Sequence, residues 1–133
     1  MNGKLVQVYS LAKDGGKNVS TNFKVREFKC KDGADVILID PKLVEILQKI
    51  RTYFGKAVTI NSAYRTPAHN KKVGGAAQSQ HLYGTAADID VKGIAPKKVA
   101  AYVETLIPNT GGIGIYAGFV HVDTRATKSR WNG

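Results

Sequence analysis

The sequence predicts one compact domain that mixes helices with short strands, on three observations. The chain has 133 residues, 43% of them apolar, which suffices for one buried core and is too short for two. Three segments place proline at the first position of a helix. Several short apolar runs end at glycine or alternate with polar residues, as strands do. We therefore expect a single domain over residues 1–133, with residues 1–22 as an N-terminal strand and loop extension.

Two helices are predicted to supply much of the core. Asp40 caps a helix that starts at Pro41 and ends at Gly55. The second helix starts at Ala95-Pro96 and ends at Pro108, because proline cannot continue it. Their core-facing residues are Leu43, Ile46, Leu47 and Ile50 in the first helix and Val99, Val103, Leu106 and Ile107 in the second.

The remaining elements are shorter. Thr66-Pro67 opens a helix that runs through Lys72 and ends at Gly74-Gly75. A loop is expected over residues 76–80, and long loops in small domains are more often functional than ornamental. Strands are predicted over 5–11, 57–61, 86–91, 112–116 and 119–123. Residues 125–133 form a basic tail that carries the only tryptophan.

Charge and cysteine content limit the partners and the chemistry. The 20 Lys+Arg against 10 Asp+Glu give a net charge of +10, which favours anionic partners. Nucleic acid ranks last among these, because no helix combines the charge with base-reading side chains. The lone Cys30 excludes an internal disulfide and a zinc site built on cysteine pairs. Any metal must therefore be held by histidine and carboxylate.

Membrane insertion and signal-driven export are not expected. No stretch approaches the roughly 18 apolar residues of a transmembrane helix. Residues 1–11 lack the uninterrupted apolar region of a secretory signal. We expect synthesis in the cytoplasm.

Two of the three histidines lie near aspartates in segments whose geometry follows from pattern. His81 precedes a turn at Gly84 and a strand in which Asp88 and Asp90 share one face. His121 and Asp123 share a face of a later strand. If the two strands are neighbours, then His81, Asp88 and His121 form a zinc set of three ligands with the fourth position open for water.

Each of these residues has an ordinary structural alternative. A buried histidine bonded to a neighbouring aspartate needs no metal. His69 lies beside Lys71 and Lys72 on the short helix and is expected to face solvent. Cys30 is expected to be a small structural residue.

A succession of motifs in the chain is specific. It reads SAYRTP at 62–67, NKKVGG at 70–75, SQHLYG at 79–84, AAD at 86–88, GGIGIY at 111–116, FVHVDTR at 119–125 and WNG at 131–133. This order resembles the M15 zinc peptidases, the D-Ala-D-Ala carboxypeptidase-like group, and in particular a small single-domain branch found in bacterial and phage cell-wall enzymes. The resemblance starts near Phe23 and covers the rest of the chain.

The resemblance implies an α+β fold in which a central, mostly antiparallel sheet carries the site and helices flank it. It implies that His81, Asp88 and His121 bind one Zn²⁺ ion, and that Arg65 and Ser79 hold the substrate. A guanidinium is suited to clamping a carboxylate or polarising a carbonyl. The alternatives are that Arg65 forms a salt bridge with an acid and that Ser79 caps a turn.

The general base does not follow from the resemblance. Relatives place an acid three positions, or a histidine two positions, before the last zinc histidine, where this chain has Gly118 and Phe119. Asp123 is the candidate base, because it shares a strand face with His121. The alternative is that Asp123 orients that histidine, and Asp90 is then the next candidate.

The implied activity is that of a zinc-dependent peptidase acting on peptidoglycan stem peptides or cross-links, as a D,D- or L,D-carboxypeptidase or endopeptidase. Zinc-activated water would attack the carbonyl, while Arg65 and Tyr116 donate to the oxyanion. The alternative is a zinc-stabilised, non-catalytic module that binds the cell wall. We expect a monomer that acts at the wall after release, as in phage or prophage lysis, and that is attracted by anionic wall polymers.

Overall fold

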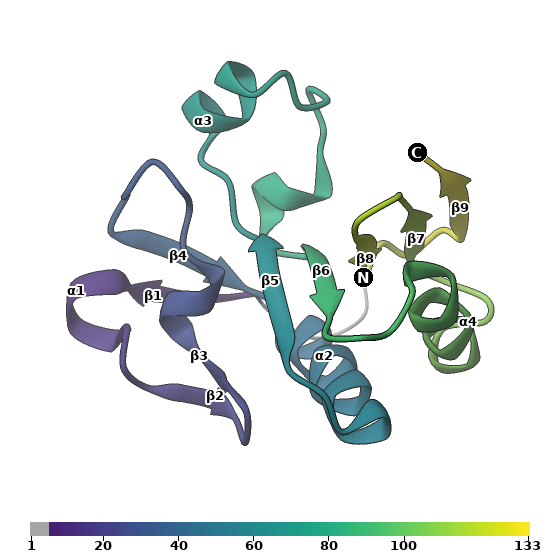
Figure 1. The fold of residues 1–133 in the computed structure, drawn as a ribbon. Coiled ribbons are helices and arrows are strands. Elements are labelled where there is room, and N and C mark those ends of the chain that lie inside the picture. The colour runs from purple at the N-terminus through teal and green to yellow at the C-terminus, as the bar shows by residue number, and fades with distance from the viewer. Residues whose placement is uncertain (1–5) are drawn as a thin grey trace.

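A computed structural model describes residues 6–133 and has a five-stranded sheet at its centre (Figure 1). The strands are β5 (Val58–Ser62), β6 (Ala86–Val91), β7 (Gly112–Ile115), β8 (Val120–Asp123) and β9 (Ser129–Asn132). Their spatial order is β5-β6-β8-β7-β9, and every pair is antiparallel except β7 with β9. The predicted α+β fold with a mostly antiparallel sheet is confirmed.

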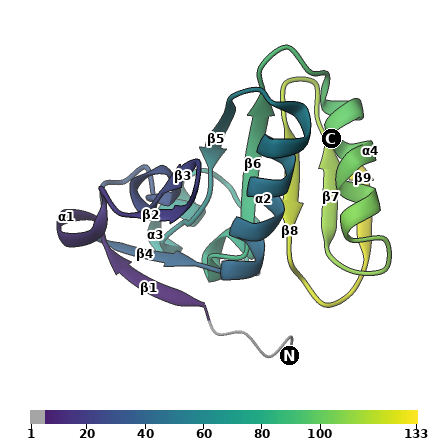
Figure 2. The same ribbon diagram turned by 90° about the horizontal axis from the view of Figure 1, so that it is seen from below.

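Two helices cover one face of this sheet. Helices α2 (Pro41–Phe54) and α4 (Pro96–Leu106) lie side by side on that face and contact each other (Figure 2). The Asp40 side chain accepts the Lys42 N–H and Gly55 ends α2 with a φ of 64°, so the predicted caps are confirmed. The apolar sides of the helices and the sheet form one core.

Strand β6 shows how the sequence separates core from site. Ala87, Ile89 and Val91 alternate along it and are buried in the core. Asp88 lies between them in the sequence and therefore points to the face that the two helices leave uncovered.

The N-terminal segment, residues 6–39, has two strands and a short helix, β1, α1 and β2, where a strand and a loop are predicted up to residue 22, and further elements after it. Its elements are β1 (Gln7–Ser10), α1 (Leu11–Asp14), β2 (Asn18–Ser20), β3 (Phe23–Lys24), the 3-10 helix η1 (Val25–Phe28) and β4 (Val36–Ile39). Strand β1 pairs with β4, and β2 pairs with β3. The predicted first strand, 5–11, begins at residue 5, which lies outside the described residues, and the structure ends it at Ser10. Phe23, Phe28 and Ile37 from this segment are buried in the common core.

Two further elements flank the site. Helix α3 (Pro67–Lys72) begins after Thr66, whose side chain accepts the His69 N–H, as the cap pattern predicts. A 3-10 helix, η2 (Gln80–Tyr83), takes up the end of the predicted loop. Part of the expected basic tail forms β9, because its backbone pairs with β7. Within residues 6–133, no helix is long and apolar enough to cross a membrane.

Candidate metal centre

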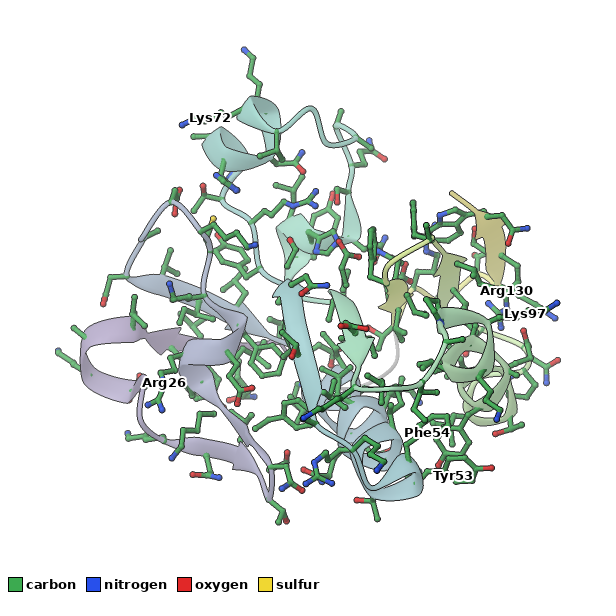
Figure 3. The ribbon with its side chains drawn as sticks, in the orientation of Figure 1. Arg26, Tyr53, Phe54, Lys72, Lys97 and Arg130 are labelled. Atoms are coloured by element: carbon green, nitrogen blue, oxygen red, sulfur yellow. The ribbon has the colours of Figure 1, made fainter. Side chains whose placement is uncertain are left out.

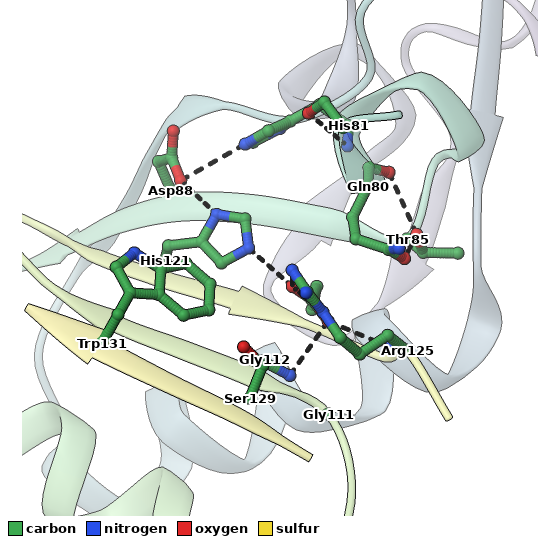
Figure 4. Close-up of polar contacts among 12 residues, drawn as sticks. Gln80, His81, Thr85, Asp88, Gly111, Gly112, His121, Arg125, Ser129 and Trp131 are labelled. Atoms are coloured by element: carbon green, nitrogen blue, oxygen red, sulfur yellow. Dashed lines mark hydrogen bonds and ion pairs between the residues drawn. The ribbon is translucent and has the colours of Figure 1, made fainter. Parts of the chain in front are cut away.

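The structure brings two histidines and one aspartate together on the uncovered face of the sheet. Asp88 on β6 lies opposite His121 on β8, and His81 reaches them from η2. One ligand atom from each of the three lies within 4.8 Å of the others, and all three residues are buried. Figure 4 shows Asp88 joined by a dashed line to each of the two imidazole rings.

Each histidine is held by its other ring nitrogen. Nδ1 of His81 lies 2.7 Å from the Ala63 carbonyl oxygen, which only accepts, so Nδ1 donates to it and Nε2, 3.4 Å from Asp88 Oδ1, is the ring nitrogen that faces the site. Nε2 of His121 lies 2.7 Å from Asp123 Oδ2 and donates to it, while Nδ1 faces the site, 3.0 Å from Asp88 Oδ1. These contacts orient both rings so that the second nitrogen of each points towards Asp88.

The donor set fits zinc. Ligands about 2.1 Å from a tetrahedral ion lie roughly 3.4 Å from one another. The distances from Asp88 Oδ1 to the two imidazole nitrogens, 3.4 and 3.0 Å, are close to that separation. Two imidazoles and a carboxylate also match a catalytic zinc site, in which the fourth position stays open.

The local sequence explains how His81 is presented. The Ser79 hydroxyl accepts the His81 N–H at 3.2 Å and caps η2, and the Arg65 N–H donates to the His81 carbonyl. Gly84 ends η2 with a φ of 73°, and a Cβ there would lie 2.5 Å from the Leu38 carbonyl oxygen. The loop therefore needs glycine both for its conformation and for its close approach to β4.

Asp123 lies behind His121. Its carboxylate is fully buried and accepts hydrogen bonds from His121, from the Gly112 N–H, and from the backbone and guanidinium of Arg125. Burial alone would raise the pKa of Asp123, but the hydrogen bonds from His121 and Arg125 outweigh it and hold the pKa well below its ordinary value. Asp123 is thus an ionised anchor for the His121 ring.

The charges around His121 favour a cation. Burial raises the pKa of Asp88, but the hydrogen bonds from His121 and His81 outweigh this effect, and the pKa lies well below its ordinary value. Burial lowers the pKa of His121, yet the hydrogen bonds to Asp123 and Asp88 raise it above its ordinary value. The two carboxylates therefore create a negative potential that stabilises a proton or a metal ion at this point.

A cleft of about 410 Å³ opens onto the three ligands. Asp88 is the one carboxylate among the described residues that line it. Arg65 lines the cleft with Nη2 3.9 Å from Asp88 Oδ2, while its Nη1 donates to Asn70 Oδ1 at 3.2 Å. Asp90 is exposed on β6, pairs with Thr59 and is absent from the lining.

The cleft lining holds both expected and unexpected residues. Ser79 and Tyr116, expected to bind substrate, line the cleft. So do Arg125 and Trp131, which the sequence places in a basic tail with no assigned role. A four-residue polar strand gives little periodicity, so the WNG motif at 131–133 marks Trp131 in the sequence but no strand pattern places it in the cleft. His69 is half-buried on α3 and lies outside the ligand group.

The fold and the candidate site together have the features of a metal-dependent hydrolase. The chain belongs to the peptidase M15 family, whose model matches residues 19–123, so the resemblance predicted from the motifs is confirmed. The chain is 30% identical over 105 residues to the probable peptidoglycan L,D-endopeptidase MepK of Haemophilus influenzae, covering 71% of this chain and 55% of that protein. It is 34% identical over 95 residues to the peptidoglycan L,D-endopeptidase MepK of Escherichia coli K12, covering 65% of this chain and 51% of that protein. The chain spans about half the length of these curated relatives.

Proposed function

We propose that this protein is a zinc-dependent peptidase that hydrolyses peptide bonds in peptidoglycan, with L,D-endopeptidase specificity. The observation that carries the proposal is the convergence of His81, Asp88 and His121 at the base of a cleft. Membership of the peptidase M15 family supports a peptidase, and the names of the relatives support the substrate and the bond.

The ligands supply the site, and zinc supplies the reactivity. His81, Asp88 and His121 would hold the ion. A bound zinc ion acidifies water to a pKa of about 7 and polarises a carbonyl. With the ion held there, the chain itself would need no nucleophilic side chain for hydrolysis at neutral pH.

Arg65 is the residue best placed to hold the substrate. Its guanidinium is partly buried in the cleft and stays charged at any physiological pH. Asn70 fixes Nη1, and the weak ion pair with Asp88 at 3.9 Å leaves Nη2 able to donate to a substrate carboxylate or carbonyl. Binding through Arg65 would align the scissile carbonyl with the ligand group.

We propose that Asp123 orients His121 and does not serve as the base. The support is its position: the carboxylate has no exposed surface, and its oxygens accept protein hydrogen bonds. A base must come within hydrogen-bond reach of the attacking water, and Asp123 is separated from the cleft by the His121 ring. Asp90 is also outside the cleft lining.

The alternative is a zinc-binding module that recognises the cell wall without cutting it. The observation in its favour is that no second carboxylate lines the cleft among the described residues. Both functions require metal, so only turnover distinguishes them.

The deciding experiment uses purified cell walls. We expect the zinc-loaded protein to release muropeptides identifiable by mass spectrometry, with loss of product after chelation and recovery after zinc is restored. His81→Ala should abolish release because it removes a ligand. His69→Ala is the matched control, since His69 is outside the ligand group, and should release products like the unchanged protein. Intact walls in the presence of metal-loaded protein would support the binding module.

The basic charge supports attraction to anionic wall polymers. Figure 3 places Arg26, Lys72 and Lys97 at separate edges of the molecule. A charge distributed in this way gives a general attraction that salt screens. We propose that it concentrates the protein, as a monomer, on the wall after its release from the cytoplasm.

A further inference from the structure

The ligands belong to a row of residues that crosses the whole central sheet. In register, the row contains Ser62 on β5, Asp88 on β6, His121 on β8, Gly114 on β7 and Trp131 on β9. Residues paired across neighbouring strands point to the same face. Trp131 therefore lies on the same face of the sheet as the metal ligands, and only strand β7 separates its strand from that of His121.

Gly114 lets the indole cross that intervening strand. A Cβ at Gly114 would lie 2.5 Å from both Cε2 and Nε1 of the Trp131 ring, which is closer than real contacts allow. With only hydrogen at this position, the indole lies over β7 and its centroid comes within 5.0 Å of the His121 ring (Figure 4). Any larger residue at 114 would push the indole away from the cleft.

The indole is held there by its neighbours. Its Nε1–H donates to the Tyr116 hydroxyl at 2.8 Å, and the Tyr116 ring stacks on Phe119 with centroids 4.3 Å apart. The Arg125 guanidinium lies 5.4 Å from the Trp131 ring centre. Tyr116, Phe119 and Trp131 all line the cleft, and we call them the aromatic wall.

We propose that the aromatic wall binds the aliphatic part of the substrate beside the scissile bond, and that Gly114 and Trp131 together determine this specificity. The inference rests on the proposed peptidase function and extends it to a substrate class. Aromatic rings bury methyl and methylene groups, whereas Arg65 pairs with a carboxylate. The cleft therefore selects a peptide with an aliphatic side chain on one side of the bond and a free carboxylate nearby.

Trp131 lies beyond residues 19–123, the part that the family model matches. The three metal ligands all lie inside that part. The segment after residue 123 therefore adds the Trp131 indole to Tyr116, Phe119 and the metal ligands, which the matched part already contains.

Fluorescence gives a direct test, because Trp131 is the only tryptophan in the chain. Soluble disaccharide-tetrapeptides prepared from purified peptidoglycan are titrated into the zinc-loaded protein. We expect a saturable change in tryptophan emission, since the ligand would cover the indole.

Kinetics on the same muropeptides tests the specificity. Trp131→Ala should raise KM about tenfold, the loss expected when one aromatic contact is removed, while kcat changes little. Trp131→Phe keeps an apolar ring and should restore much of the affinity. Zinc content and circular dichroism should match those of the unchanged protein in both variants.

Gly114→Ala tests the aromatic wall without substituting any of its three residues. It should raise KM by a similar factor and abolish the emission change, because the new methyl group displaces Trp131. Gly118→Ala is the matched control: nothing lies within 4 Å of a Cβ there, so KM and emission should stay unchanged.

The outcomes separate this inference from the proposed function. If Trp131→Ala turns over substrate with an unaltered KM and the unchanged protein shows no emission change, the aromatic wall does not bind substrate, and the proposed hydrolysis is unaffected. If the protein shows no turnover but its emission changes saturably, and Gly114→Ala abolishes that change, the proposed peptidase function is wrong and binding by the aromatic wall is supported.

Discussion

The central sheet and the N-terminal layer of β1 to β4 use polar side chains in opposite ways. In the sheet, Asp88, His121 and Asp123 are buried, and His121 contacts both carboxylates. In the N-terminal layer, exposed Asp35 accepts hydrogen bonds from Ser10 and Ala12 above an apolar interior. Buried ionisable groups with strongly shifted pKa values cluster at functional sites, so this group in the sheet indicates a role beyond folding. Changes in the two regions should therefore have different effects.

The largest effect should come from Asp88. Asp88→Asn removes the negative charge between the two imidazoles and should reduce bound zinc from about one ion per chain to near zero. Peptidoglycan hydrolysis should fall below detection. Metal analysis after dialysis, with muropeptide release in parallel, measures both.

Asp90→Asn provides the control on the same strand. Asp90 is exposed and outside the cleft lining, so zinc content and hydrolysis should be retained. Full zinc occupancy in Asp88→Asn would show that the ligand group is assigned incorrectly.

A smaller effect should come from Asp123→Asn. The amide retains the shape but no longer carries the charge that orients and polarises the His121 ring. We expect zinc affinity to fall about 10- to 100-fold, measured by competition with a chelator of known affinity. An unchanged affinity with a lost kcat would instead indicate that Asp123 is the general base.

The smallest effect should come from Asp35→Asn in the N-terminal layer. Hydrogen bonds from the Ala12 N–H and the Ser10 hydroxyl lower the pKa of Asp35 below its ordinary 3.8. A lowered pKa in the folded state stabilises the protein above about pH 3.8, and this stabilisation is lost as pH falls through the lowered value. The variant should therefore unfold slightly more easily at pH 7, and the difference should disappear in acid.

Denaturant unfolding at several pH values measures this difference. Zinc affinity should stay the same, since Asp35 is not part of the ligand group. A zinc affinity that falls with Asp35→Asn would show that the two regions are coupled.

Local sequence signals account for the parts of the fold and of the candidate site that could be predicted. Capping by Asp40 and proline at position 41 define α2, and alternation around Asp88 defines β6 and its two faces. These features depend on neighbours in the sequence. They group His81, Asp88 and His121 only if β6 and β8 are neighbours, which the resemblance to the M15 peptidases implied and local pattern did not.

Long-range contacts account for what the sequence did not reveal. Strand β9 is polar and short, and it forms only because its backbone pairs with β7. The Asp123 carboxylate is held behind His121 by hydrogen bonds from Gly112 and Arg125. The spacing of residues in the sequence does not predict these contacts. The position of the Trp131 indole depends on glycine at position 114 of the neighbouring strand, where no side chain blocks it.

Placing the indole on β9 has an evolutionary consequence. Substitutions at Gly114 or within residues 129–132 replace none of the three proposed metal ligands, so, with the aromatic wall as proposed, a descendant would be able to acquire a different peptide preference while those ligands stay the same. Diversification of this lineage would then be concentrated at one edge of the sheet, where a single methyl group is enough to reshape the cleft.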